Sequence, residues 1–176
     1  MDSGIDTRAR DTSNPVFSNG ASPPELSVVI PCLNEADTIE ICIRKAQQAL
    51  REHNICSEII IADNGSTDGS QAIAARMGAQ VIAVEAKGYG NALMGGIEAA
   101  HGEFIIMGDA DDSYDFLEIP SFIAKLRQGC DLVQGCRLPS GGGKVEPGAM
   151  PFSHRWLVHD QATCLGITKC ASRVPS

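Results

Sequence analysis

Short apolar runs alternate with segments of helical periodicity along most of this chain. The apolar runs are rich in Val, Ile and Leu and have the pattern of buried strands, at residues 26–32, 58–63, 80–84, 103–108 and 131–134. Between them, apolar positions recur with the period of a helix at residues 37–53, 66–77, 89–100 and 119–128. Because strand and helix alternate with short connections, the pattern predicts an α/β fold, with a mostly parallel sheet flanked by helices.

Several polar residues stand directly after the predicted strands. The first strand is followed by Asn34 and Glu35, and the second ends at Asp63. The fourth is followed by Asp109 and Asp111. Ligands of parallel α/β sheets bind at the carboxyl ends of the strands. We therefore expect the topology to bring these distant side chains to one cleft.

The fourth strand leads into a cluster of three carboxylates, Asp109, Asp111 and Asp112. Alternate residues of an extended chain point the same way, so Asp109 and Asp111 are expected to converge. Converging carboxylates repel each other unless a cation lies between them. Hard oxygen ligands suit Mg²⁺ or Mn²⁺ that also binds a substrate phosphate. The alternatives are a solvated acidic turn and a phosphotransferase with Asp109 as its nucleophile.

Each of three further positions could either bind a ligand or have a structural role. Asp63 could accept a hydrogen bond from the N–H of a nucleotide base, or form a turn in which Ser66 or Thr67 caps the next helix. The glycine-containing segment 87–91 precedes the third helix, where a diphosphate is favoured, although a lone Gly-x-Gly is a weak signal. Arg137 could bind a phosphate bidentately or pair with one of the aspartates.

Composition narrows the class of partner. The chain has 22 Asp and Glu against 14 Lys and Arg, a formal net charge of −8, which disfavours nucleic acid as a partner. Its seven cysteines form no Cys-x-x-Cys pair, and their position in apolar segments favours reduced, buried thiols and a cytoplasmic location. No apolar run approaches the length of about 18 residues that predicts a membrane-spanning helix.

Several segments together resemble a known family. Three of them resemble the signature segments of the family 2 glycosyltransferases, which have the Rossmann-like GT-A fold: residues 27–35, 61–70 and 108–112. Residues 87–93 and 135–137 narrow the likeness to the polyprenyl-phosphate branch, the enzymes similar to dolichyl-phosphate mannose and glucose synthases. The match covers about residues 25–156, and the ordered co-occurrence of the segments makes it more specific than any one of them.

The resemblance implies transfer of a sugar from a nucleotide sugar, of the UDP-glucose or GDP-mannose type, to a polyprenyl phosphate. The reaction would invert the anomeric carbon and depend on Mg²⁺ or Mn²⁺ bound by Asp109 and Asp111. The residues implied to bind the nucleotide sugar, with Asp63 on the base, are Pro31, Asn34, Glu35, Asp63, Lys87, Gly88 and Asp109. Asp111 and Arg137 are the implied catalytic residues, and Arg137 and Arg155 would contact the acceptor phosphate.

The likeness to the family fades after about residue 157. We therefore expect a disordered leader at 1–24, a nucleotide-sugar-binding GT-A domain at 25–157 and a non-matching tail at 158–176, which leaves the C-terminal part of the fold incomplete. Such a truncated chain could be a nucleotide-sugar-binding module without turnover, which is the alternative to an active transferase. We expect a cytoplasmic location, with peripheral contact at the cytosolic face of the membrane that holds the lipid acceptor.

Overall fold

The computed structural model describes residues 23–135 and the backbone of residues 165–168. Its strands are β1 (Leu26–Cys32), β2 (Ser57–Asp63), β3 (Gln80–Ala83), β4 (Phe104–Met107), β5 (Leu132–Gly135) and β6 (Leu165–Thr168). Its helices are α1 (Ile39–Glu52), α2 (Ser70–Arg76), α3 (Tyr89–Glu98) and α4 (Ile119–Arg127), with a short 3₁₀ helix, η1 (Phe116–Glu118), directly before α4.

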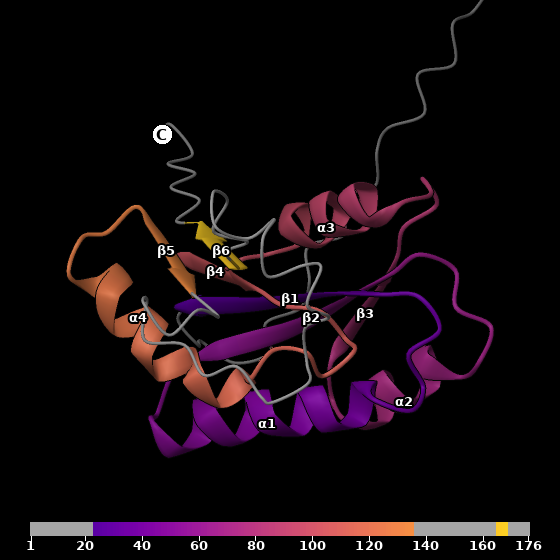
Figure 1. The fold of residues 1–176 in the computed structure, drawn as a ribbon, viewed down its shortest axis with the longest axis horizontal. Coiled ribbons are helices and arrows are strands. Elements are labelled where there is room, and N and C mark those ends of the chain that lie inside the picture. Colours follow the sequence, from indigo (N-terminus) through magenta and orange to yellow (C-terminus); the bar gives the residue numbers. More distant parts are fainter. Residues whose placement is uncertain (1–22, 136–164, 169–176) are drawn as a thin grey trace, which may run out of the picture.

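The main sheet is parallel and has four strands in the order β3-β2-β1-β4. The inner strand β1 pairs with β2 along its whole length, from Leu26 opposite Ser57 to Cys32 opposite Asp63. Figure 1 shows α1, α2 and α4 on one face of this sheet and α3 on the other. The α/β fold expected from the sequence is therefore confirmed.

Burial on both faces explains why β1 is apolar at every position except Ser27. All seven of its residues are buried. On one face, α1 covers the sheet with a stripe of buried residues: Ile39, Cys42, Ile43, Ala46, Ala49 and Leu50. On the other face, α3 approaches so closely at Gly96 that a Cβ there would collide with Val29 Cγ1. The close packing of both helical layers fixes the positions of the strand ends.

The fifth strand differs from the sequence prediction. It forms, but β5 pairs antiparallel with β6 in a separate two-stranded sheet and does not extend the parallel one. Its residues alternate between exposed and half-buried, and Leu132 is 50% exposed. Such alternation is typical of a strand with one solvated face, whereas the inner strand β1 of the parallel sheet is buried throughout.

The cysteines in the described part of the chain are free thiols, but only some are buried. Cys32 and Cys42 are buried beneath the loops at the carboxyl edge of the sheet, whereas Cys56 and Cys130 are exposed. The prediction of buried thiols is therefore wrong for Cys56 and Cys130. These two residues precede β2 and β5 and lie in connections rather than in the apolar runs themselves.

None of the helices within residues 23–135 combines the length and the apolar character that a membrane span requires. The longest of those described, α1, has 14 residues, fewer than the roughly 20 that cross a bilayer.

Candidate nucleotide-sugar and metal site

A cavity of about 470 Å³ lies at the carboxyl ends of β1, β2 and β4. Its walls are formed by Pro31, Cys32, Leu33, Glu35, Asn64, Lys87, Gly88, Tyr89, Ala92, Asp109, Ala110 and Asp111. The chain runs outward from β1 through β2 to β3 and then crosses to β4 on the other side of β1. This reversal of strand order is where parallel α/β sheets bind their ligands.

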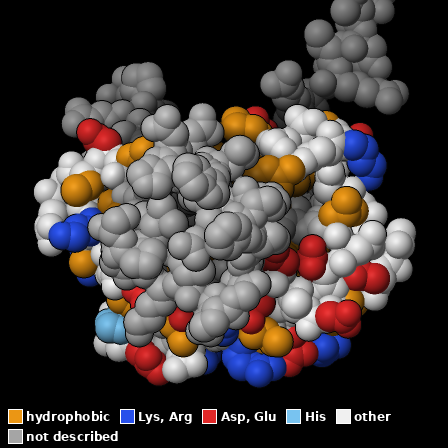
Figure 2. All heavy atoms as spheres, viewed as in Figure 1, with side chains coloured by type: hydrophobic (Ala, Val, Ile, Leu, Met, Phe, Trp, Pro, Cys, Tyr) orange, Lys and Arg blue, Asp and Glu red, His pale blue; other side chains and the backbone are white. Residues whose placement is uncertain are grey.

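Most of the site residues predicted from the sequence line this cavity. Those in its walls are Pro31, Glu35, Lys87, Gly88, Asp109 and Asp111. Asn34, in the loop after β1, and Asp63, the last residue of β2, do not line the cavity. Arg137 and Arg155 lie outside the described residues. In Figure 2, acidic side chains are visible on the right-hand side, toward which the loops after β1 and β2 project in Figure 1.

The loop after β4 presents the carboxylates of Asp109 and Asp111 to the cavity. Asp109 Oδ1 accepts a hydrogen bond of 2.9 Å from the hydroxyl of Tyr89. Asp111 Oδ1 accepts one of 2.9 Å from the backbone N–H of Ser113. In each case the recorded bond engages Oδ1, and a carboxylate has further lone pairs that can bind a cation.

Asp112, the remaining member of the Asp109, Asp111 and Asp112 cluster, has a structural role. Asp112 has a left-handed backbone, with φ of 59°, and its side chain accepts a hydrogen bond of 2.8 Å from Nζ of Lys45 on α1. Beneath the loop, the buried thiol of Cys42 donates to the carbonyl oxygen of Ala110 at 3.4 Å. Burial raises the pKa of Cys42 to about 11, so the thiol remains a donor at neutral pH. These contacts anchor the acidic loop to α1.

The chemistry of this donor set fits a divalent cation that is shared with a substrate. Within the described residues, no group of three or more His, Cys, Asp and Glu side chains could form a metal site by itself. Mg²⁺ is usually bound by one or two carboxylates together with substrate phosphates and water, rather than by a complete protein cage. Asp109 and Asp111 meet that requirement, because both line the same cavity.

Asn64 holds the wall of the cavity that Lys87 and Gly88 form. It is not among the site residues predicted from the sequence. Its side chain donates to the carbonyl oxygens of Val84 and Ala86 at 2.9 and 2.8 Å, and accepts from the N–H of Gly88 at 2.7 Å. Its own carbonyl oxygen accepts a 2.7 Å hydrogen bond from Nζ of Lys87. Asn64 thus fixes the segment before α3 to the end of β2. Its place directly after Asp63 at a strand end is the signal that could have identified it.

Comparison with known proteins assigns the chain to a family. The model of the family described as glycosyl transferase family 2 matches residues 27–168, which is most of the chain. The chain belongs to glycosyl transferase family 2. The matched span includes the parallel sheet except its first residue, Leu26, and all the residues that line the cavity.

Curated relatives of this family 2 chain are longer than it is. The low-salt glycan biosynthesis hexosyltransferase of Haloferax volcanii is 44% identical over 132 residues, 74% of this chain and 31% of that protein. An uncharacterized glycosyltransferase of Mycobacterium tuberculosis is 37% identical over 147 residues, 78% and 64% respectively. The undecaprenyl-phosphate 4-deoxy-4-formamido-L-arabinose transferase of Pseudomonas paraeruginosa is 36% identical over 119 residues, 64% and 35%. The chain spans between about a third and two-thirds of these proteins.

A solved structure supports the fold assignment. Glucosyl-3-phosphoglycerate synthase from Mycobacterium tuberculosis, crystallised with Mn²⁺, UDP and glucosyl-3-phosphoglycerate, is 30% identical to this chain. The superposition covers 63% of this chain and 43% of that one, with a TM-score of 0.56. The parallel sheet and its flanking helices therefore have the GT-A architecture expected from the sequence.

In this family 2 domain, Asp63 forms a tight turn at the end of β2. It is 1% exposed, and its carboxylate accepts hydrogen bonds from the N–H groups of Gly65 and Ser66 and from the side-chain amide of Gln71. Burial alone would raise the pKa of Asp63, but the hydrogen bonds outweigh it, so the pKa lies below its usual value. The turn interpretation is thus confirmed for Asp63. A contact of Asp63 with a nucleotide base stays a prediction.

The predicted helix cap is wrong. Ser66 and Thr67 precede α2, which begins only at Ser70 after Gly69 with φ of 96°. Instead of capping the helix, Ser66 Oγ accepts from the N–H of Asn34 at 2.9 Å, and Asn34 Oδ1 accepts from the N–H of Thr67 at 2.8 Å. These bonds join the loops after β1 and β2. Asn34, a predicted nucleotide-binding residue, therefore has an observed role in holding the loops together.

The ionised Asp63 turn should make folding stability depend on pH. Its pKa is depressed in the folded state, so its contribution is fully present above the unfolded-state pKa of about 3.9 and is lost as the pH falls through the folded-state value. The Asp63→Asn variant should be less stable than the wild type by about 1–3 kcal/mol at neutral pH. The difference should narrow in acid. Urea unfolding at a series of pH values measures both curves, and parallel curves would contradict this account.

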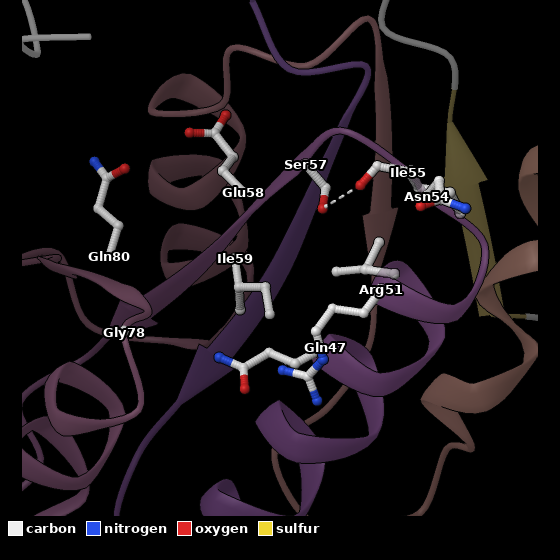
Figure 3. A pocket seen from close by; sticks show the side chains of 10 residues that line it. Gln47, Arg51, Asn54, Ile55, Ser57, Glu58, Ile59, Gly78 and Gln80 are labelled. Carbon is white, nitrogen blue, oxygen red and sulfur yellow. Dashed lines mark hydrogen bonds between the residues drawn. The ribbon is translucent and has the colours of Figure 1, made fainter. Parts of the chain in front are cut away.

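A second hollow, of about 600 Å³, lies at the opposite edge of the sheet, where β2 and β3 begin. Figure 3 shows side chains from α1, from the loop before β2 and from the start of β2 around it, including Gln47 and Arg51. The hydrogen bond drawn there joins Ser57 Oγ to the carbonyl oxygen of Ile55 at 3.2 Å. None of the predicted site residues lines this hollow. Despite its larger volume, it therefore lacks the chemistry of the carboxyl-edge cavity.

Proposed function

We propose that this family 2 domain binds a nucleotide sugar, of the UDP-glucose or GDP-mannose type, in the carboxyl-edge cavity. The observation that carries the proposal is that one cavity has an acidic wall and a second wall that suits an anion. Asp109 and Asp111 form an acidic wall, and Lys87 and Gly88 form a wall that suits an anion. A diphosphate bridged to a divalent cation has the charge distribution that complements both walls.

The wall before α3 provides groups for a diphosphate. Gly88 is the N-cap of α3, with φ of 114°, so the backbone at this point can approach a ligand without a side chain in the way. The N-terminus of this ten-residue helix favours negative charge. Nζ of Lys87 lies at the same place, held against the carbonyl oxygen of Asn64. A phosphate would compete for this ammonium group.

Asp109 and Asp111 would hold Mg²⁺ or Mn²⁺ against the diphosphate. When bound, the cation would act as a Lewis acid that stabilises the negative charge of the departing nucleoside diphosphate. In this arrangement Asp111 has its catalytic role through its position at the cation. The solved structure of glucosyl-3-phosphoglycerate synthase with Mn²⁺ and UDP supports this assignment by similarity.

We further propose that the whole protein transfers the sugar to a polyprenyl phosphate with inversion at the anomeric carbon. The relative from Pseudomonas paraeruginosa is named as an undecaprenyl-phosphate transferase, which supports this class of acceptor. A phosphate monoester is largely ionised at neutral pH, because its second pKa is about 6. It is therefore already a nucleophile, and the protein needs to align it rather than deprotonate it. Arg137 and Arg155 are the proposed contacts of the acceptor phosphate, and the cytosolic membrane face is the proposed place of reaction.

Binding and transfer measurements test the proposal in two steps. Calorimetric titration with UDP-glucose and GDP-mannose should show binding of one of them that is strengthened by Mn²⁺ and lost when the ion is chelated. Incubation of the chain with the radiolabelled donor and undecaprenyl phosphate should then yield labelled glycolipid. Donor binding without glycolipid would favour the alternative, a nucleotide-sugar-binding module without turnover. Absence of metal-strengthened binding to either donor would contradict the proposal.

A further inference from the structure

Tyr89 connects the two walls of the carboxyl-edge cavity. It is the first residue of α3, directly after Gly88, and its hydroxyl donates to Asp109 Oδ1 at 2.9 Å across the cavity. Both residues line the cavity. The phenol therefore joins the proposed diphosphate wall to the proposed metal wall.

We infer that Tyr89 is a positioning residue for the divalent cation, because its hydroxyl holds the carboxylate of Asp109 in the orientation that binds the ion. This inference rests on the proposed function of the site. A hydrogen bond to Oδ1 restrains rotation of the carboxylate and leaves Oδ2 and the remaining lone pairs for the cation. Hydrogen-bond partners of ligating side chains typically change metal affinity by about 10–100-fold when they are removed.

Packing does not explain the contact. Tyr89 is 61% exposed, so its ring contributes little to the buried core. Removing only the hydroxyl should therefore leave the fold intact while it frees the Asp109 carboxylate.

The position of Tyr89 also links the proposed cation to the proposed diphosphate wall, formed by Lys87 and Gly88. The preceding residues, Lys87 and Gly88, are both held by Asn64 through 2.7 Å hydrogen bonds. A shift of this segment toward or away from a diphosphate would move the phenol, and with it the support of Asp109. Through Tyr89, the orientation of the Asp109 carboxylate would therefore depend on the position of Lys87 and Gly88.

The test is Mn²⁺ binding by the Tyr89→Phe variant, measured by electron paramagnetic resonance of free Mn²⁺ with and without UDP. We expect the Mn²⁺ affinity in the presence of UDP to fall by about 10-fold or more, with an unchanged melting temperature and unchanged metal-free UDP binding. The control is Ser121→Ala, because it also removes a hydroxyl that donates to a carboxylate, Glu118 Oε2 at 3.2 Å, at an exposed position on α4 that does not line the cavity. It is expected to leave the affinity at the wild-type value.

The outcomes separate this inference from the proposed function. Wild-type affinity in Tyr89→Phe, while Asp109→Asn loses Mn²⁺, would overturn the role of Tyr89 and leave the metal site standing. An equal loss in Tyr89→Phe and Ser121→Ala would also overturn it, because the effect would not be specific to the bond with Asp109. A wild-type chain that binds no Mn²⁺ with UDP would overturn both proposals.

Discussion

Replacing Asp109 and Asp111 together by asparagine is expected to lower the affinity for a Mn²⁺–nucleotide sugar by at least about 100-fold. Loss of groups that merely support a metal ligand already costs about 10–100-fold, and here both anionic ligands would be removed. An amide oxygen keeps the shape but not the charge that offsets dehydration of the ion. Calorimetric titration in the presence of Mn²⁺ measures the loss. The fold should be retained, because Asp112 and Lys45 still anchor the loop.

A matched control separates direct ligation from the general acidity of the chain. Glu103→Gln combined with Asp131→Asn removes the same two charges from exposed positions that precede β4 and β5, away from the cavity. This control variant should bind the Mn²⁺–nucleotide sugar as the wild type does. An equal loss in both double variants would mean that long-range electrostatic attraction, rather than a defined site, accounts for the binding.

Asn64→Asp is expected to lower the free energy of unfolding by about 2–4 kcal/mol although it barely changes the shape of the side chain. Asn64 is 4% exposed, and its amide nitrogen donates to two carbonyl oxygens. In the variant, a carboxylate oxygen would face those same carbonyl oxygens in a buried place, which costs more than a lost neutral hydrogen bond. Urea unfolding measures the effect. Nucleotide binding should weaken as well, because Asn64 holds Lys87 and Gly88.

Asn91→Asp is the control for this prediction. Asn91 is exposed and donates one hydrogen bond of 2.9 Å to the carbonyl oxygen of Lys87. The same chemical change there should alter the free energy of unfolding by no more than about 0.5 kcal/mol. If both variants lost a similar free energy of unfolding, the burial of Asn64 would not be the cause of the effect.

The sequence predicted the inner strands of the parallel sheet well because β1 is buried along its whole length and β2 over its last four residues. The run from Leu26 to Cys32 is β1 to the residue, and the predicted strand 58–63 differs from β2 by one residue. Apolar side chains are required on both faces of such strands, so the signal is continuous and its ends are sharp. The placement of Asp109 and Asp111 at one cavity followed from the same logic, since parallel strands end at a common edge.

The polar contacts between loops were beyond the reach of the sequence. Ser66 and Thr67 have the chemistry of helix caps, but the groups they satisfy belong to Asn34, more than 30 positions earlier in the chain. Local pattern cannot reveal which distant loop competes for a hydroxyl or a backbone N–H. The bonds made by Asn64 and Tyr89 likewise depend on which segments the fold brings together, although the place of Asn64 at a strand end marks it as a candidate.

The central claim is that the carboxyl edge of the sheet binds a divalent cation between Asp109, Asp111 and a nucleotide diphosphate. The most direct measurement is an anomalous difference map, collected near the Mn absorption edge, from a crystal of the chain grown with Mn²⁺ and UDP. The account predicts a peak within about 2.0–2.6 Å of oxygen atoms from both carboxylates and from the diphosphate. A peak at the hollow beside Gln47 and Arg51, or UDP bound with no peak at Asp109 and Asp111, would contradict it.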